Sequence, residues 1–169
     1  MVTELAFISL IVSVLFTAGG ARRLGELPGS VSTSVFTMPR RKRYVWTAML
    51  WLSTYTLTPA LFQVVPGNHV YAAHAFATSV LLAGLFPIFK RSISRGFMTL
   101  VSSAWCFSQV CVALLCPWLL LMWPVVAIVL FVLYMMEDDL PAALRGKGVF
   151  LAESMCYVTL FMSIIIEIL

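Results

Sequence analysis

Polar side chains that interrupt long apolar runs are the first candidates for chemistry in this chain. The sequence has 169 residues, of which 62% are apolar and 11% charged. A polar or ionisable group inside an apolar segment is costly to bury, so it marks a functional site by default. Three such side chains lie within apolar runs and are candidates for a transport pathway: His74, Gln109 and Glu153.

A second polar group falls at or near the ends of the apolar runs and consists of Glu4, His69, His74 and Glu167. Two imidazoles and a carboxylate are ligands that zinc accepts. However, His69 and His74 are five residues apart, whereas chelating pairs on a helix are separated by three or four. This spacing favours a helix contact for His74. We therefore assign no metal site, no catalytic residue and no cofactor, and the cluster stays a minor alternative.

The segment that follows the first apolar run combines positive charge with glycine and hydroxyl residues. Backbone amides and hydroxyl groups in such a segment can bind an anion. Each Lys or Arg near an anionic leaflet adds about 1 kcal/mol of attraction. The segment is therefore a candidate for binding lipids, anionic ones in particular, through Arg22, Arg23, Ser30, Ser32, Arg40, Arg41, Lys42 and Arg43.

Six apolar runs are long enough, or nearly so, to position these residues as membrane helices, since a bilayer-crossing helix needs about 20 residues. Pro117 separates the fourth run from the fifth, because proline interrupts a helix. The sequence predicts an all-α, polytopic membrane helix bundle with a single domain over 1–169. The expected spans are 5–21, 45–65, 70–89, 97–116, 118–136 and 149–166.

The positive charges orient this bundle. All 11 Lys and Arg residues fall in the segments after the first, third and fifth runs. Six spans place these three segments on one side of the membrane, which the positive-inside rule identifies as cytoplasmic. Both termini are then expected outside. The net charge of +4 is explained by these basic cytoplasmic segments. Nucleic-acid binding is not needed to account for it, so we expect no nucleic-acid partner.

Small residues spaced for helix packing predict which faces point inward. Such stripes occur at Ser9, Ser13, Thr17 and Ala21, at Ala75, Ser79 and Ala83, and at Ser102, Cys106, Gln109 and Ala113. Pro59 and Pro87 lie inside the second and third runs, where proline is expected to bend or break a helix.

The first loop also carries a short resemblance. The stretch Leu27-Pro28-Gly29-Ser30-Val31-Ser32 resembles a Leu-Pro-x-Ser-Ile/Val-Ser segment of small bacterial multi-pass membrane proteins with no established activity. Val31 stands where isoleucine is more usual, and Phe36 is the one aromatic residue nearby. The resemblance covers about six residues and implies the cytoplasmic (inner) membrane of a bacterium.

These patterns favour a non-enzymatic membrane protein that acts through lipid or protein contacts, with a protein partner or a second copy of the chain as alternatives to lipid. Two other functions remain open. One is a small transporter or transporter subunit, and the other is a membrane enzyme acting on lipid. The sequence contains no HExxH, GxSxG or phosphate-loop motif, which leaves the enzyme without a recognisable catalytic signature.

Overall fold

The computed structural model describes residues 4, 5, 7–15, 30–90, 92–136 and 146–168, and every regular element within them is helical. Residues 7–15 form the first helical segment. The other elements are α2 (Val31–Ser34), η1 (Val35–Thr37), α3 (Arg40–Val64), η2 (Gly67–His69), α4 (Val70–Phe89), α5 (Arg95–Leu115), η3 (Pro117–Leu121), α6 (Met122–Met135) and α7 (Gly148–Ile168).

Local sequence signals set most of these boundaries. Ser94 begins α5, because its hydroxyl accepts a hydrogen bond from the Phe97 amide at 3.2 Å, as an N-cap residue does. Pro117 ends α5 and opens η3, as the sequence predicts. The prediction was that Pro59 and Pro87 bend or break their helices, and the structure excludes the break, because α3 and α4 continue through them.

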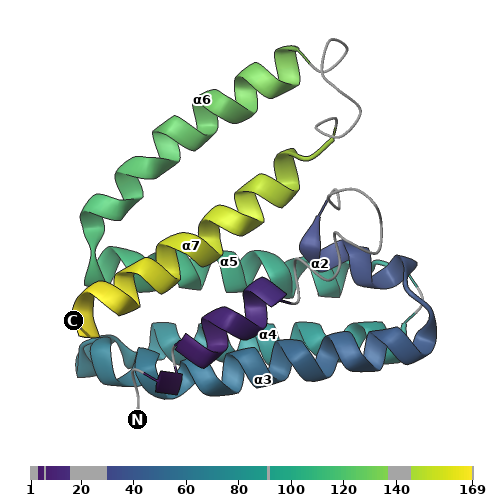
Figure 1. Cartoon of the computed structure of the whole chain (residues 1–169), viewed down its shortest axis with the longest axis horizontal. Helices are drawn as coiled ribbons and strands as arrows, with labels where there is room; N and C mark the ends of the chain where they lie inside the picture. The colour runs from purple at the N-terminus through teal and green to yellow at the C-terminus, as the bar shows by residue number, and fades with distance from the viewer. Residues whose placement is uncertain (1–3, 6, 16–29, 91, 137–145, 169) are drawn as a thin grey trace.

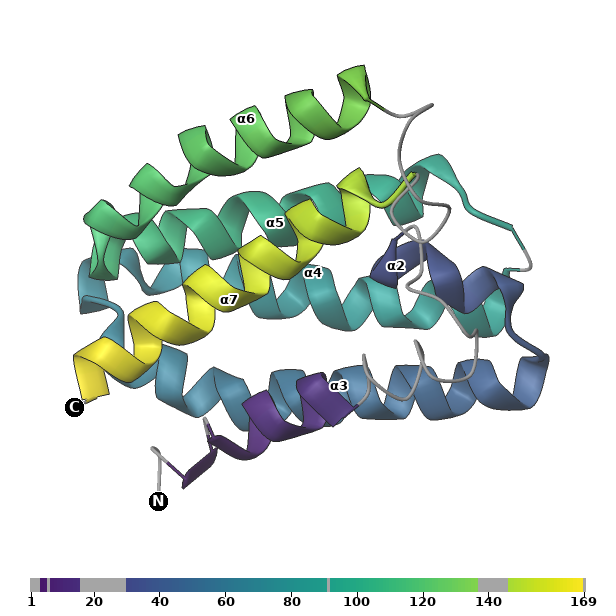
Figure 2. The same ribbon diagram turned by 45° about the horizontal axis from the view of Figure 1, so that its top comes forward.

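The helices form a bundle with one outlying member (Figure 1). Helix α4 packs against both α3 and α5, and α7 packs on α5 while also contacting α3. Figure 2 shows the first helical segment beside α3 and shows α6 leaning away from the rest of the bundle. The bundle therefore has a core between α3, α4, α5 and α7.

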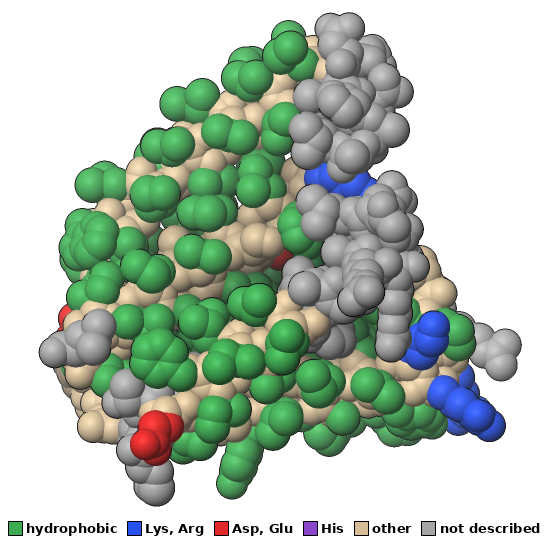
Figure 3. All heavy atoms as spheres, in the orientation of Figure 1, with side chains coloured by type: hydrophobic (Ala, Val, Ile, Leu, Met, Phe, Trp, Pro, Cys, Tyr) green, Lys and Arg blue, Asp and Glu red, His purple; other side chains and the backbone are tan. Residues whose placement is uncertain are grey.

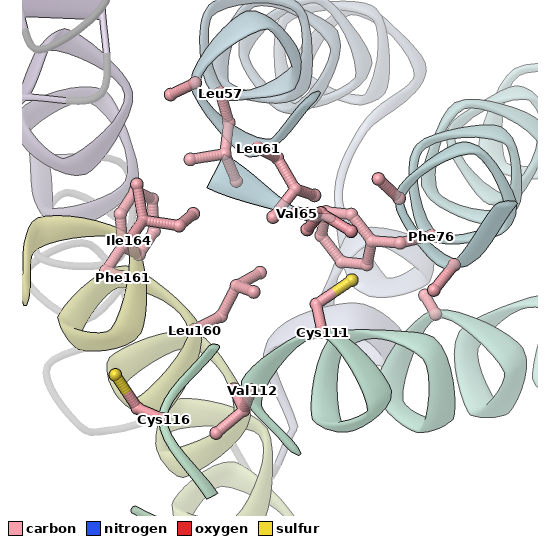
Figure 4. Close-up of a cluster of buried hydrophobic side chains, with 14 of the residues drawn as sticks. Leu57, Leu61, Val65, Phe76, Cys111, Val112, Cys116, Leu160, Phe161 and Ile164 are labelled. Carbon is pink, nitrogen blue, oxygen red and sulfur yellow. The ribbon is translucent and has the colours of Figure 1, made fainter. Parts of the chain in front are cut away.

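That core is apolar and lies towards the end of the bundle where the chain terminates. Leu61 from α3, Phe76 from α4, Cys111 from α5 and Leu160 from α7 converge there (Figure 4). Leu61, Cys111 and Leu160 are completely buried. This convergence fixes the relative positions of the four helices.

The outer surface of the bundle has the character of a membrane protein. On α6 only Val126 is buried, while Phe131 and Tyr134 are 64% and 74% exposed. A helix whose surface is apolar on every side is typical of a lipid environment rather than an aqueous one. Four described helices are long and apolar enough to cross a bilayer: Gly67–Phe89, Arg95–Leu115, Pro117–Met135 and Gly148–Ile168. The regular structure of the described residues is therefore entirely helical, and the four apolar helices are those of a membrane protein.

Helix α3 has the predicted position but is not among those four. Its hydroxyl side chains lower its hydropathy, and they bond within the bundle. Thr47 donates to the Gly84 carbonyl at 2.8 Å, while Thr54 donates to its own helix at Leu50. A polar helix of this kind can lie among other helices because its hydroxyl groups are satisfied there.

The predicted inner stripes met different outcomes. Ser9 and Ser13 both hydrogen-bond to Ser53 of α3, at 3.0 and 2.8 Å, which confirms their packing role. Thr17 and Ala21 lie outside the described residues. The stripe on α5 was wrong, since Ser102, Cys106 and Ala113 are exposed. The buried face of α5 instead carries Phe97, Val101, Ala104, Ser108, Cys111 and Val112. This face mixes bulky residues with small ones, and other small residues of α5 are exposed, so residue size alone did not identify it.

Gly84 is a point of close contact between α3 and α4. A Cβ atom there would lie 2.7 Å from Nε1 of Trp51, which is held in place by donating to the Leu81 carbonyl. We expect Gly84→Ala to lower the free energy of unfolding by about 1–3 kcal/mol through overpacking. Gly67→Ala is the control, because no atom lies within 4 Å of its added Cβ. Thermal or denaturant unfolding in detergent would measure both, and equal stability of the two variants would contradict this contact.

Candidate functional site

Glu153 is the most deeply buried charged side chain in the described part of the chain, with 1% of its surface exposed. It lies on α7, five residues after the helix begins at Gly148. At the helical rise this is about 7.5 Å from that end. A buried carboxylate is stable only when its oxygens have hydrogen-bond donors or a counter-charge.

The donors come from Ser30, Val31 and Ser32, more than 120 residues earlier in the chain. The Ser30 hydroxyl donates to Oε1 at 2.9 Å, and the Ser32 hydroxyl donates to the same oxygen. The Val31 amide donates to Oε2, and the Ser32 amide contacts both oxygens at 3.3 and 3.4 Å. We call this arrangement the Glu153 cradle.

The cradle exists because the chain turns into a short helix at Ser30. Ser30 has an extended backbone (φ −155°, ψ 137°) and caps α2, accepting from the Thr33 amide at 3.3 Å. This turn points the next two amides in one direction. Glycine and hydroxyl residues were predicted to present amides and hydroxyls to an anion here. In the structure Ser30 and Ser32 present them to the chain's own carboxylate.

A cavity of about 420 Å³ adjoins the cradle. Its walls come from the first helical segment and from α2, α3, α4, α5 and α7. The lining is largely apolar, with Leu57, Val80, Val101 and Phe161 among its members, and Glu153 is its one charged residue within the described part of the chain. A cavity of this size and character is typical of a small-molecule site.

The lining of the cavity extends along the bundle. On α5 it runs from Phe97 to Ser108, about 16 Å at the helical rise. Its length is about half of the 30 Å hydrocarbon core of a bilayer.

Basic side chains lie at the same end of the bundle as the cradle, and Figure 3 shows those of one face gathered where α3 begins. The structure gives them different roles. Arg43 donates to three backbone carbonyls, those of Phe36, Met38 and Lys90, at 3.0, 2.9 and 3.1 Å. It therefore ties the segment before α3 to the end of α4.

The neighbours of Arg43 are available to other partners. Arg40, Arg41 and Lys42 are exposed, and the Arg40 guanidinium lies 6.0 Å from the centre of the Tyr44 ring. The further predicted lipid-binding residues Arg22 and Arg23 lie outside the described residues. An anion-binding role for this group remains a prediction.

Gln109 joins three helices. Its carbonyl oxygen accepts from Trp123 Nε1 of α6 at 2.8 Å, and its amide nitrogen donates to the Thr159 hydroxyl of α7 at 3.2 Å. It does not line the cavity. The structure thus gives Gln109 a bracing role, and Trp123 and Thr159 are partners that the sequence pattern did not reveal.

His74 lies apart from both Gln109 and Glu153. Its ring is exposed on α4 and packs on Phe62 with 4.3 Å between ring centres. The three predicted pathway residues therefore do not line one cavity. The alternative cluster of Glu4, His69, His74 and Glu167 is not assembled either. Within the described residues, no three His, Cys, Asp or Glu side chains lie together as metal ligands.

Comparison with protein-family models, curated proteins and solved structures finds no match for this chain. The site must therefore be interpreted from its own geometry. Glu153, Ser30 and Ser32 were each singled out by sequence, but their pairing was not. The sequence contains no local signal for it, because more than 120 residues separate the partners.

The two roles of the basic residues can be separated by matched substitutions. Arg43→Gln removes the guanidinium that holds three carbonyls, and we expect it to lower the free energy of unfolding by about 1–3 kcal/mol. Arg41→Gln removes an exposed charge and should change stability by less than about 0.5 kcal/mol. Unfolding in detergent measures both, and a stable Arg43 variant would show that this residue is not a structural clamp.

Proposed function

We propose that this protein binds a long apolar or amphipathic molecule taken from the surrounding bilayer, and that it acts through this contact rather than as an enzyme. The observation that carries the proposal is the cavity of about 420 Å³ between the helices, with a largely apolar lining in which Glu153 is the one carboxylate among the described residues. A molecule dissolved in lipid enters such a cavity by exchanging one apolar environment for another, so shape and the single charged group decide which molecule is held.

The membrane topology that we propose has six spans, with both termini outside and the basic loops in the cytoplasm. Successive helices run in opposite directions, so Arg40, Lys90, Arg95 and Lys147 lie at one end of the bundle (Figure 1). Glu4 and Glu167 lie at the other end. This separation supports the orientation given by the positive-inside rule. The first helical segment and α3 supply the two further spans.

The location that we propose is the cytoplasmic membrane of a bacterium, with anionic lipid head groups near the exposed Arg40, Arg41 and Lys42. The basic end then faces the anionic leaflet, which attracts Lys and Arg. The lining of the cavity includes Phe97 and Glu153, which lie near the ends of α5 and α7 on the side of these charges.

The topology is tested by thiol labelling in intact cells. A cysteine placed at Asn68 should react with an impermeant reagent, because the model of six spans puts this turn outside. One placed at Arg41 should react only after the cells are permeabilised. The four native cysteines are first replaced with alanine. The reverse pattern, or labelling at both positions, would contradict the six spans.

The cavity is tested with a photoreactive long-chain alcohol that carries a diazirine in the middle of its chain. Ala104 lines the cavity, so we expect Ala104→Phe to fill it and to reduce labelling of α5 and α7 at least about fivefold. Ala113 lies on the same helix but is exposed, and Ala113→Phe should leave labelling of these peptides unchanged. Mass spectrometry of the labelled peptides provides the measurement, and equal labelling of the two variants would refute binding in the cavity.

A further inference from the structure

The cavity wall contains polar groups that the protein already satisfies and others that it leaves open. The Ser32 hydroxyl donates to Glu153, whose oxygens are occupied by the cradle, and the hydroxyls of Ser13 and Ser53 share a hydrogen bond of 2.8 Å. The hydroxyls of three further wall residues donate to the backbone of their own helices at 2.8, 2.7 and 2.8 Å, namely those of Thr54, Ser108 and Ser154. None of these groups needs a ligand.

Two hydrogen-bond donors in the wall are left open, the Tyr157 hydroxyl on α7 and the Trp105 indole N–H on α5. Neither has a hydrogen-bond partner in the part of the chain that the structure describes. Both side chains are half-buried, so part of each remains accessible. Tyrosine and tryptophan usually find a partner when they are buried, because a donor that is withdrawn from water without an acceptor is costly. An acceptor from outside the protein would remove this cost.

The depth of these two donors in the membrane limits where an acceptor can come from. Trp105 lies in the middle of α5 and Tyr157 near the middle of α7, each about 15 Å from either end of its helix at the helical rise. The two helices meet at this level, because Gln109 of α5 donates to the Thr159 hydroxyl of α7 at 3.2 Å. In the topology proposed above, this level is the centre of the bilayer, where there is no water to accept a hydrogen bond.

An acceptor that reaches this level must belong to an uncharged part of a molecule, because a charge at the bilayer centre is strongly disfavoured. The polar parts of ordinary bilayer lipids lie outside the hydrocarbon core, so their head groups do not supply it. A carbonyl oxygen fits both conditions. It is uncharged, it donates nothing, and its two lone pairs can accept from one donor or from two.

We propose that the ligand of this cavity is an uncharged long-chain molecule with a carbonyl oxygen, such as a ketone or an ester, and that Tyr157 and Trp105 donate hydrogen bonds to this oxygen. This inference rests on the proposed function and adds the chemical class of the ligand and the residues that select it. The apolar wall, with Leu57 and Phe161 among its members, holds the chain. The two donors distinguish a carbonyl compound from a hydrocarbon of the same length.

The test compares 2-pentadecanone with pentadecane, which has the same carbon chain and no oxygen. Each competes with a photoreactive alkane, which carries a diazirine in its chain, for the purified full-length protein in a neutral detergent. Mass spectrometry of the labelled α5 and α7 peptides gives the concentration of each compound that halves the labelling. We expect Tyr157→Phe to lower the preference for the ketone over the alkane at least about threefold, while pentadecane competes as before. The Tyr157 hydroxyl has no partner among the described residues, so this variant should unfold at the same temperature as the unmodified protein.

Tyr55→Phe is the matched control, because Tyr55 is 78% exposed on α3 and does not line the cavity. It should leave the preference for the ketone unchanged. Trp105→Phe removes the second donor and should also lower the preference at least about threefold, and the affinity of the same variant for pentadecane corrects for the changed cavity volume. Infrared spectroscopy of the ketone with a ¹³C-labelled carbonyl gives an independent measurement. Hydrogen bonding lowers the stretching frequency of the bound carbonyl, and Tyr157→Phe should raise it again.

The two proposals fail in different ways. If both compounds displace the photoreactive alkane and Ala104→Phe reduces its labelling, but the preference for the ketone is the same with and without the Tyr157 hydroxyl, the cavity binds apolar molecules and the carbonyl proposal is overturned. A carbonyl frequency that neither Tyr157→Phe nor Trp105→Phe changes would also overturn it. If the photoreactive alkane does not label α5 and α7 at all, the proposed function itself is wrong.

Discussion

The contact between Glu153 and the segment Ser30–Ser32 is the constraint on which the functional half of this structure depends. A carboxylate with 1% exposure is costly unless donors surround it. Here the donors are two hydroxyls and two amides from a segment more than 120 residues away. Because Val31 and Ser32 also line the cavity, the same contact that satisfies the charge holds one wall of the cavity against α7.

A second constraint acts at the same end of the bundle, and it explains why the basic residues are not equivalent. The Arg43 guanidinium holds the carbonyls of Phe36 and Met38, which lie four and six residues after Ser32 of the cradle, and that of Lys90 at the end of α4. Arg41 and Lys42, next to it in sequence, are exposed. A run of positive charges that orients a membrane protein can thus contain one residue that stabilises the fold. Arg43 can do so because a planar guanidinium donates to several carbonyls at once.

The sequence predicted the helices well and their faces poorly, for a physical reason. Apolar run length gave the positions of α4 to α7 within a few residues, because bilayer thickness dictates length. The inward face of α5 was missed because lipid and core are both apolar, so Phe97 and Val101 carry no sign of being buried. Glu153 was identifiable as unusual, but its partners depend on tertiary packing. The cavity could not be predicted at all, since it is the space left between helices.

Stability alone is a weak explanation for a carboxylate in this position. Replacing a buried charged group and its partners with apolar residues of the same shape often leaves the folding free energy unchanged. The alignment of α3, α4, α5 and α7 already comes from the apolar core around Leu61, Phe76 and Leu160, towards the other end of the bundle. Glu153 therefore adds to this fold chiefly what an apolar residue cannot supply, which is a set of acceptor atoms that hold the segment Ser30–Ser32 against α7 in the wall of the cavity.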